Sequence, residues 1–297
     1  MLTEISEKRL FPSMAPKGLS LPKGSKVFTI GSCFAREIED ALSTQFDFPV
    51  MSYQAPEDES YAGKARGVLN KFTPESMLRE LEWLVALRKN FDQFDELTER
   101  LFLYQLSEDE VLDIGLHLTK PVSRQRFMQR RLSIFNIYKE LESVDAVVVT
   151  LGNLEQHWLK DGRALESVSV NKRFIKAEYG ALTVKKQGED EVLKVVESLV
   201  ALIRDINPAA RIILTVSPVP MERTDIGEHI VLENFSNKLT LVRAAKYWAE
   251  RVDNSYYFPS FEMVSFVGIT AFKDDLRHVK PDVIRMIMYS FLTAVTA

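Results

Sequence analysis

The sequence has only one cysteine and four histidines among its 297 residues. A single cysteine excludes an internal disulfide and favours a reducing compartment. The histidines, the cysteine and the carboxylates show no spacing typical of a metal-binding motif. We therefore expect neither a metal ion nor another cofactor.

Long apolar runs and an excess of basic charge are missing as well. No stretch is long enough to cross a membrane, and the first residues contain no apolar core of a secretion signal. These absences predict a cytoplasmic protein without a membrane span. A net charge of −4 excludes binding to nucleic acid by phosphate neutralisation. The one dense basic cluster, at 124–131, is typical of a solvated helix face.

The chain does contain strands and helices in alternation. Apolar, β-branched runs predict strands, and apolar residues at helical spacing predict helices. The predicted strands are 26–31, 50–53, 145–152, 211–218 and 256–258. The predicted helices between or after them are 34–42, 191–206, 235–252 and 282–294. This alternation predicts an α/β fold, a three-layer α/β/α sandwich around a mostly parallel sheet.

The domain organisation follows from the same pattern. Prolines and glycines mark residues 1–24 as an irregular N-terminal arm. Residues 25–297 then form a single domain. Helical patterns at 74–104 and 121–143 interrupt the strand–helix alternation, and both of their flanks belong to it. They predict a helical insertion at about 74–143 instead of a second domain.

The most informative segment is Val-Phe-Thr-Ile-Gly-Ser-Cys-Phe-Ala at 27–35. It predicts a strand, a sharp turn and a helix, with Ser32 and Cys33 at the tip. Unpaired N–H groups at the start of a helix stabilise an oxyanion and, with the helix dipole, favour a thiolate. Ser32 and Cys33 are therefore candidate nucleophiles. The alternative is that small residues here only allow a tight turn.

Two further groups of polar residues fall at the same edge of the predicted sheet, where ligands bind in open parallel sheets. Gly152 and Asn153 follow one strand, and Asp275 and His278 precede the last helix. Their spacing lets Asp275 orient the His278 imidazole toward a nucleophile. The alternative is a helix-capping carboxylate beside a surface histidine.

The remaining site candidates are donors and substrate contacts. The Asn153 amide and the backbone N–H of Gly67 are candidates for an oxyanion hole, although Asn153 also suits an Asx turn. His157 and Trp158 lie close enough to Asn153 in sequence to contact a substrate, and Trp158 offers a face for a sugar ring. Packing is the alternative for both. His117 carries no functional signal.

The pentapeptide Gly-Ser-Cys-Phe-Ala at 31–35 resembles the signature of the GSCFA family, which is similar to the SGNH (GDSL-like) hydrolases. Those enzymes have nucleophile, glycine, asparagine and Asp-x-x-His blocks in this order, matched here at 31–35, 67, 152–153 and 275–278. Supporting stretches are 150–152, 216–219, 236–238 and 257–262. The resemblance spans residues 27–290 and implies an SGNH-like, flavodoxin-like sheet. It departs from the usual Gly-Asp-Ser, because Ser32 takes the aspartate position and Cys33 the serine position.

The resemblance implies an enzyme, a hydrolase or acyltransferase of ester bonds. Its substrate would be a small molecule or glycan that carries an acyl ester, with a carbohydrate favoured, as in surface-polysaccharide biosynthesis. A covalent acyl-enzyme would form on Cys33 or Ser32, with Cys33 favoured. Two alternatives stay open: a cysteine hydrolase of amide bonds, and a non-catalytic glycan-binding or assembly module on the same scaffold.

Overall fold

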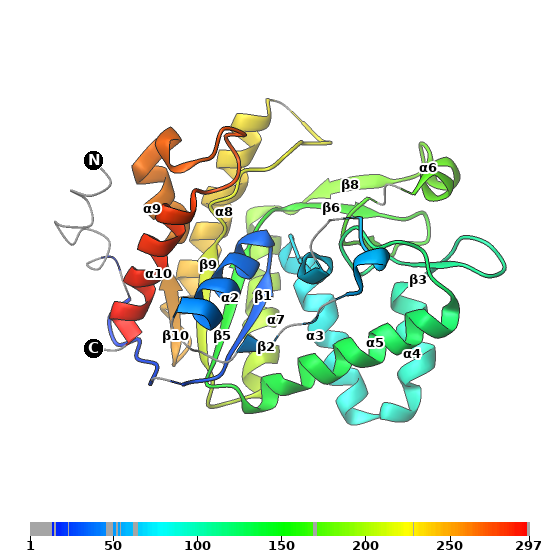
Figure 1. Cartoon of the computed structure of the whole chain (residues 1–297), viewed down its shortest axis with the longest axis horizontal. Helices are drawn as coiled ribbons and strands as arrows, with labels where there is room; N and C mark the ends of the chain where they lie inside the picture. The colour runs from blue at the N-terminus through cyan, green and yellow to red at the C-terminus, as the bar shows by residue number, and fades with distance from the viewer. Residues whose placement is uncertain are drawn as a thin grey trace.

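A parallel sheet of five strands forms the centre of the protein (Figure 1). The computed structural model describes residues 14, 16–22, 24–45, 50–51, 53, 55–61, 65–168, 171–227 and 229–295. The strands of the sheet are β1 (Val27–Gly31), β2 (Val50–Met51), β5 (Ala146–Leu151), β9 (Arg211–Val216) and β10 (Ser255–Phe258). Their order is β10-β9-β5-β1-β2, which is the flavodoxin-like order. The predicted parallel α/β sheet is thus confirmed.

Side-chain alternation along the strands separates two cores, one on each face of the sheet. In β5, Val147 and Val149 belong to one apolar cluster, and Ala146 and Val148 belong to the other. Because both faces are covered, the strands read in the sequence as nearly continuous apolar runs.

The helices make the outer layers of the sandwich. Helices α7 (Glu189–Ile206) and α8 (Ile230–Ala249) contribute buried side chains to the first apolar cluster, the one that contains Val147 and Val149. Helices α2 (Cys33–Gln45), α9 (Ser260–Val267) and α10 (Pro281–Val295) contribute buried side chains to the second apolar cluster, the one that contains Ala146 and Val148. The predicted three layers are confirmed, with α9 as an addition that the sequence pattern did not predict.

The insertion contains α3 (Pro74–Lys89), α4 (Phe94–Phe102) and α5 (Arg124–Lys139). These helices lie beside the β2 edge of the sheet, while α10 lies beside β10 (Figure 1). Buried side chains of the insertion, such as Trp83, share the first apolar cluster with Val147 of the sheet. The described part of the chain also contains short 3₁₀ helices: η2 (Glu57–Glu59), η3 (Ala65–Leu69), η4 (Phe91–Gln93), η5 (Glu140–Ser143) and η6 (Gly268–Ala271).

The insertion is not purely helical. Its residues 103 and 104, predicted as the end of a helix, belong to β3 (Leu103–Gln105), which pairs antiparallel with β4 (Val111–Asp113). The helix ends at Phe102, and Leu103 already has extended backbone angles. The helical prediction for these residues was therefore wrong.

The basic cluster on α5, predicted as a solvated face, is one only in part, since Arg124 is exposed but two other arginines are not. Arg130 and Arg131 are fully buried. Arg131 donates to Glu80 at 2.6 Å and to Asp113 at 2.7 Å. Buried carboxylates from α3 and β4 supply the counter-charge that makes this burial possible.

A second small sheet follows β5 and was not predicted. It consists of β6 (Glu155–Trp158), β7 (Ala164–Leu165) and β8 (Thr183–Lys186), with β6 in the middle and both pairs antiparallel. The short helix α6 (Lys172–Glu178) lies between β7 and β8 in the chain. This sheet supplies one wall of the cavity described below.

Two remaining predictions concern the N-terminus and the membrane. Residues 1–13, 15 and 23 of the predicted arm lie outside the described residues, and Leu19 and Leu21 are buried in the second apolar cluster. Within the described part of the chain, no helix has the length and apolar character that a membrane crossing requires.

Candidate functional site

The carboxyl ends of β1, β5 and β9 meet at a cavity of about 440 Å³. The residues that follow these strands line it: Ser32 and Cys33, Gly152 and Asn153, and Ser217. Strand β1 lies between β2 and β5, the point at which the strand order reverses. Open parallel sheets bind ligands at this topological position.

Glycine is required at the turn between β1 and α2. Gly31 has a φ of +150°, and a Cβ there would lie 2.4 Å from the carbonyl oxygen of Thr150. The close approach brings the turn against the end of β5, where the Ser32 N–H donates to the Thr150 oxygen at 3.3 Å. This contact explains the first residue of the Gly-Ser-Cys-Phe-Ala segment.

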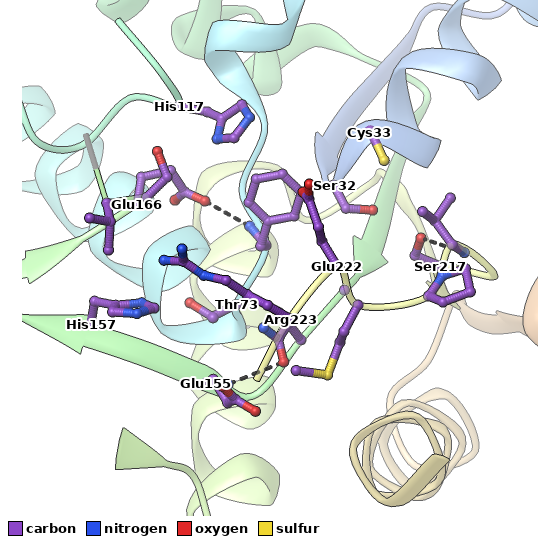
Figure 2. A pocket seen from close by; sticks show the side chains of 18 of the residues that line it. Ser32, Cys33, Thr73, His117, Glu155, His157, Glu166, Ser217, Glu222 and Arg223 are labelled. Atoms are coloured by element: carbon purple, nitrogen blue, oxygen red, sulfur yellow. Dashed lines mark hydrogen bonds between the residues drawn. The ribbon is translucent and has the colours of Figure 1, made fainter. Parts of the chain in front are cut away.

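The side chain of Ser32 is free of the capping role that serine usually has before a helix. Its backbone oxygen accepts the N–H of Ala35 at 2.8 Å. Its hydroxyl is buried and makes no hydrogen bond to any described residue. Figure 2 shows Ser32 and Cys33 together at the start of α2, on the cavity wall. A buried hydroxyl without a partner is costly, so this one is available for a ligand.

Burial raises the pKa of the Cys33 thiol above its ordinary value. Arg277, Lys238 and a hydrogen bond from the Phe34 N–H act in the opposite direction, but desolvation is the larger effect. The helix start was expected to favour the thiolate, and that expectation is not met in the free protein. A nucleophilic Cys33 therefore needs a base to take its proton.

Gly152 is held between two neighbours. A Cβ at this position would lie 2.8 Å from the carbonyl oxygen of Phe72 and 3.1 Å from the Cβ of Ser32. The N–H groups of Gly152 and Asn153 both donate to the Phe72 oxygen, at 3.1 and 2.7 Å. These two backbone donors are therefore occupied, and an oxyanion has to be bound by other groups.

The Asn153 side chain forms the Asx turn that the sequence suggested. Its Oδ1 accepts the N–H groups of Leu154 and Glu155 at 2.7 and 3.2 Å. The same oxygen accepts Nδ2 of Asn237 at 3.1 Å. Three donors fix the oxygen, so the amide nitrogen is the group left for a ligand in the cavity that Asn153 lines.

Helix α8 reaches the end of β5 through two adjacent residues. Asn237 binds Asn153, and the buried Lys238 donates to the carbonyl oxygen of Gly152 at 2.7 Å. Both contacts come from the segment Ser-Asn-Lys at 236–238. Lys238 also lines the cavity.

Asp275 and His278 form the pair that their spacing predicted. Nδ1 of His278 lies 2.6 Å from Oδ2 of Asp275, and the other carboxylate oxygen accepts the His278 N–H at 2.9 Å. The hydrogen bond to His278 holds the pKa of Asp275 well below its usual range. Both side chains are about half exposed, and neither is among the residues lining the cavity. Arg277, between them, lines the cavity and binds Glu222 at 2.8 Å.

The other predicted contacts are divided by the structure. His157 lines the cavity, and its Nε2 lies 2.8 Å from Oδ2 of Asp225. Trp158 is not a lining residue, because successive side chains of β6 point to opposite faces. Gly67 lies in η3 and does not line the cavity either. Of the chain that follows η3, Phe72 and Thr73 line the cavity instead.

The wall opposite the turn contains two titratable residues that sequence reasoning missed, His117 and Glu166 (Figure 2). Burial lowers the pKa of His117 to about 4, and its Nδ1 has no partner among the described residues. Burial raises the pKa of Glu166 to about 7, and one of its oxygens is likewise without a partner. They follow β4 and β7, short strands that carry no strong sequence signal.

The loop after β9 closes the cavity and is tied down by β6. Glu155 accepts the Thr224 hydroxyl at 2.6 Å and the Asp225 N–H at 3.0 Å. The His157–Asp225 contact adds a third link. These bonds hold residues 219–225 over the strand ends, where Figure 2 shows Glu222 and Arg223 projecting across the site.

Comparison with known protein families matches residues 26–291 to the GSCFA family. No curated protein matches the sequence significantly. The matched region includes every residue named above as lining the cavity.

Proposed function

The chain belongs to the GSCFA family, and we propose that it is an SGNH-type esterase or acyltransferase that acts on an acyl ester through a covalent intermediate on Cys33. The observation that carries this proposal is the convergence of Cys33, the unpartnered Ser32 hydroxyl and the Asn153 amide on one cavity at the strand ends. Nucleophile and donors of this kind are the parts that acyl transfer requires.

In the first half of the reaction, the Cys33 sulfur attacks the acyl carbonyl, and its proton passes to a base. The carbonyl oxygen becomes an oxyanion, for which the Asn153 amide and the Ser32 hydroxyl are the available donors. Collapse of this intermediate breaks the bond to the alcohol oxygen, and the alcohol leaves with a proton. The acyl group is then a thioester on Cys33.

In the second half, an acceptor hydroxyl attacks the thioester. We assign its deprotonation to His278, which Asp275 holds by one ring nitrogen. The half-exposed position of His278 suits a group that meets an acceptor arriving from solvent. Water as acceptor makes an esterase, and a sugar hydroxyl makes an acyltransferase. The thiolate leaves and recovers its proton through solvent from the imidazolium.

The lining of the cavity favours a hydroxyl-rich substrate. His117, His157 and Glu166 line it beside Ser167 and Asp225, so the lining contains both hydrogen-bond donors and acceptors. A volume of about 440 Å³ is within the range of small-molecule sites. A sugar carrying a short acyl group combines the required size and hydrogen-bonding character.

The test is covalent trapping with p-nitrophenyl acetate. We expect a burst of p-nitrophenol and an acetyl group on Cys33 by intact mass and peptide mapping, removed by neutral hydroxylamine as a thioester should be. Cys33→Ala should lose the adduct and Ser32→Ala should keep it. Acetylation of Ser32 in both wild type and Cys33→Ala would instead make Ser32 the nucleophile.

A second function is favoured by one observation, the placement of Asp275 and His278 outside the cavity lining. If the pair plays no chemical part, the scaffold is a glycan-binding or assembly module. Absence of both burst and adduct in the wild-type protein, together with saturable binding in a glycan screen, would support that function over an enzyme.

A further inference from the structure

Lys238 is a buried amine without a carboxylate partner. Its side chain is 1% exposed, and its Nζ donates to the carbonyl oxygen of Gly152. Among the described residues no carboxylate forms an ion pair with it. Lys71, which is equally buried, has the usual arrangement, since its Nζ lies 2.8 Å from Glu80. A buried ammonium without counter-charge is costly, so Lys238 needs another explanation than stability.

The surroundings of Lys238 favour its neutral form. Burial lowers its pKa to about 7, and Cys33 is the one titratable group of the described chain that acts on it. Glu233, which lies on the same helix as Lys238, is paired with Lys186.

The groups that face Cys33 also leave the role of proton acceptor to Lys238. Arg277 acts on the thiol from the loop before α10, and Glu37 acts from the next turn of α2. Arg277 is a cation already bound to Glu222, and a guanidinium does not accept a proton at neutral pH. Asp275 and His278 do not line the cavity.

His117 lines the cavity, but burial lowers its pKa to about 4, so it is a weak base, and His157 is engaged by Asp225. Lys238 lines the same cavity and acts on the thiol, so it is the basic group left for this role.

We propose that Lys238 is the general base of the acylation half-reaction, its neutral amine taking the proton of the Cys33 thiol as the sulfur attacks the acyl carbonyl. The S–H bond breaks, the new S–C bond forms, and Lys238 becomes an ammonium. When the carbon–oxygen bond to the alcohol breaks, Lys238 returns the proton to the leaving oxygen. This role rests on the proposed acyl-enzyme mechanism and complements that of His278, which serves the acceptor in the second half.

The role explains why α8 reaches the strand end at this point. The hydrogen bond to Gly152 holds Nζ beside the turn, because Gly152 itself lies against Ser32. A lysine desolvated in this way keeps a pKa near the working pH, where a general base is most effective.

The experiment is pre-steady-state acylation by p-nitrophenyl acetate, followed as the burst rate between pH 5.5 and 9. In the wild type we expect the burst rate to rise through pH of about 7, since the neutral amine is the active form. Lys238→Met should lower the burst rate by roughly 10²–10⁴ at neutral pH. Its burst rate should then keep rising toward alkaline pH without levelling off above pH of about 7, because only the thiolate of Cys33, whose pKa burial raises, can attack. His278→Ala should keep the burst and its pH profile while slowing steady-state turnover.

Lys238→Arg separates catalysis from a structural role. Arginine keeps a cation and a donor for the Gly152 oxygen but accepts no proton, so it should be as slow as Lys238→Met. The control is Lys186→Met, which should leave the burst unchanged. Lys186 lies in β8 and pairs with Glu233, a residue of the helix that carries Lys238. Thermal unfolding confirms that each variant is folded.

Two results would overturn the assignment of Lys238 and leave the acyl-enzyme mechanism intact. A burst rate within about threefold of wild type in Lys238→Arg would reduce Lys238 to a positioning cation. Loss of the burst in His278→Ala but not in Lys238→Met would transfer the acylation step to His278, with the acyl-enzyme mechanism intact. Absence of any adduct in the wild type would instead overturn the mechanism itself, and the role of Lys238 with it.

Discussion

Nζ of Lys238 lies 2.7 Å from the carbonyl oxygen of Gly152, so a residue in the middle of α8 is fixed to the end of β5. Gly152 in turn lies against Ser32 across a gap with no room for a Cβ. The candidate nucleophile, the strand end and the buried amine are therefore one packed unit. Changes to any of the three should affect the other two.

Gly152→Ala should disturb this unit directly. The added Cβ meets the Phe72 oxygen at 2.8 Å and the Ser32 Cβ at 3.1 Å, so backbone has to move. We expect a loss of roughly 1–3 kcal/mol in the free energy of unfolding and a strong loss of acylation. Gly188→Ala is the control, since its Cβ would meet only Glu191 at 3.7 Å. Equal stability of the two variants in urea unfolding would contradict the close approach.

Asn153→Asp should separate the turn from the oxyanion hole. The aspartate keeps an oxygen for the N–H groups of Leu154 and Glu155 but loses the amide donor. We expect a folded protein whose turnover falls by roughly 10²–10³. Asn153→Ala should lose turnover to a similar extent and stability as well. If Asn153→Asp keeps wild-type turnover, the residue serves the Asx turn alone.

Glu166→Gln should change how stability depends on pH. In the folded protein the pKa of Glu166 is about 7, raised by burial, against about 4.3 for an ordinary glutamate. Folding favours the protonated carboxyl group. The contribution of Glu166 to the free energy of unfolding is therefore fully present below pH 4 and is lost as the pH rises through 7. Relative to wild type, Glu166→Gln should gain about 2–4 kcal/mol between pH 4 and 8.

Urea unfolding at a series of pH values measures this gain. Glu166→Ala removes the same carboxyl group, so it should show the same pH dependence on top of a larger constant loss. A difference from wild type that stays flat with pH would mean that the carboxyl is ionised in the folded protein like any surface glutamate.

Asp275→Asn should slow deacylation and leave acylation intact. The carboxylate lies 2.6 Å from Nδ1 of His278 and stabilises the imidazolium that forms when His278 takes the acceptor proton. Asparagine can still accept the backbone N–H groups of Arg277 and His278, so the loop should keep its shape. We expect steady-state turnover to fall by roughly 10²–10⁴, with the acyl-enzyme accumulating by intact mass. Unchanged turnover would remove the orienting role.

Much of the site was predictable because its parts are local in sequence. Gly31, Ser32 and Cys33 lie at the end of a continuous apolar run, and such a run is typical of a parallel strand buried on both faces of a sheet. Asp275 and His278 need only one loop to meet. The cavity at the strand ends followed from the parallel sheet, since such strands all end at one edge.

The parts that were missed depend on contacts between distant segments. His117 and Glu166 reach the cavity from short strands whose partners lie elsewhere in the chain. Arg130 and Arg131 were predicted to lie on a solvated helix face. The local sequence does not show the carboxylates, distant in the chain, that pair with them in the folded protein. Lys238 belongs to a segment that resembled the family, but its burial beside Gly152 is a property of the folded protein.

By itself, the sequence determined the central strands, most of the helices packed on them and the turn at residues 31–33. Apolar spacing and the geometry of a glycine act over a few residues, so they can be recognised locally. Tertiary structure decided the protonation chemistry. The pKa values of Cys33, Glu166 and Lys238 depend on water removed and charges brought near by segments far apart in the chain. Desolvation is a property of the packed whole, so no local pattern could have revealed it.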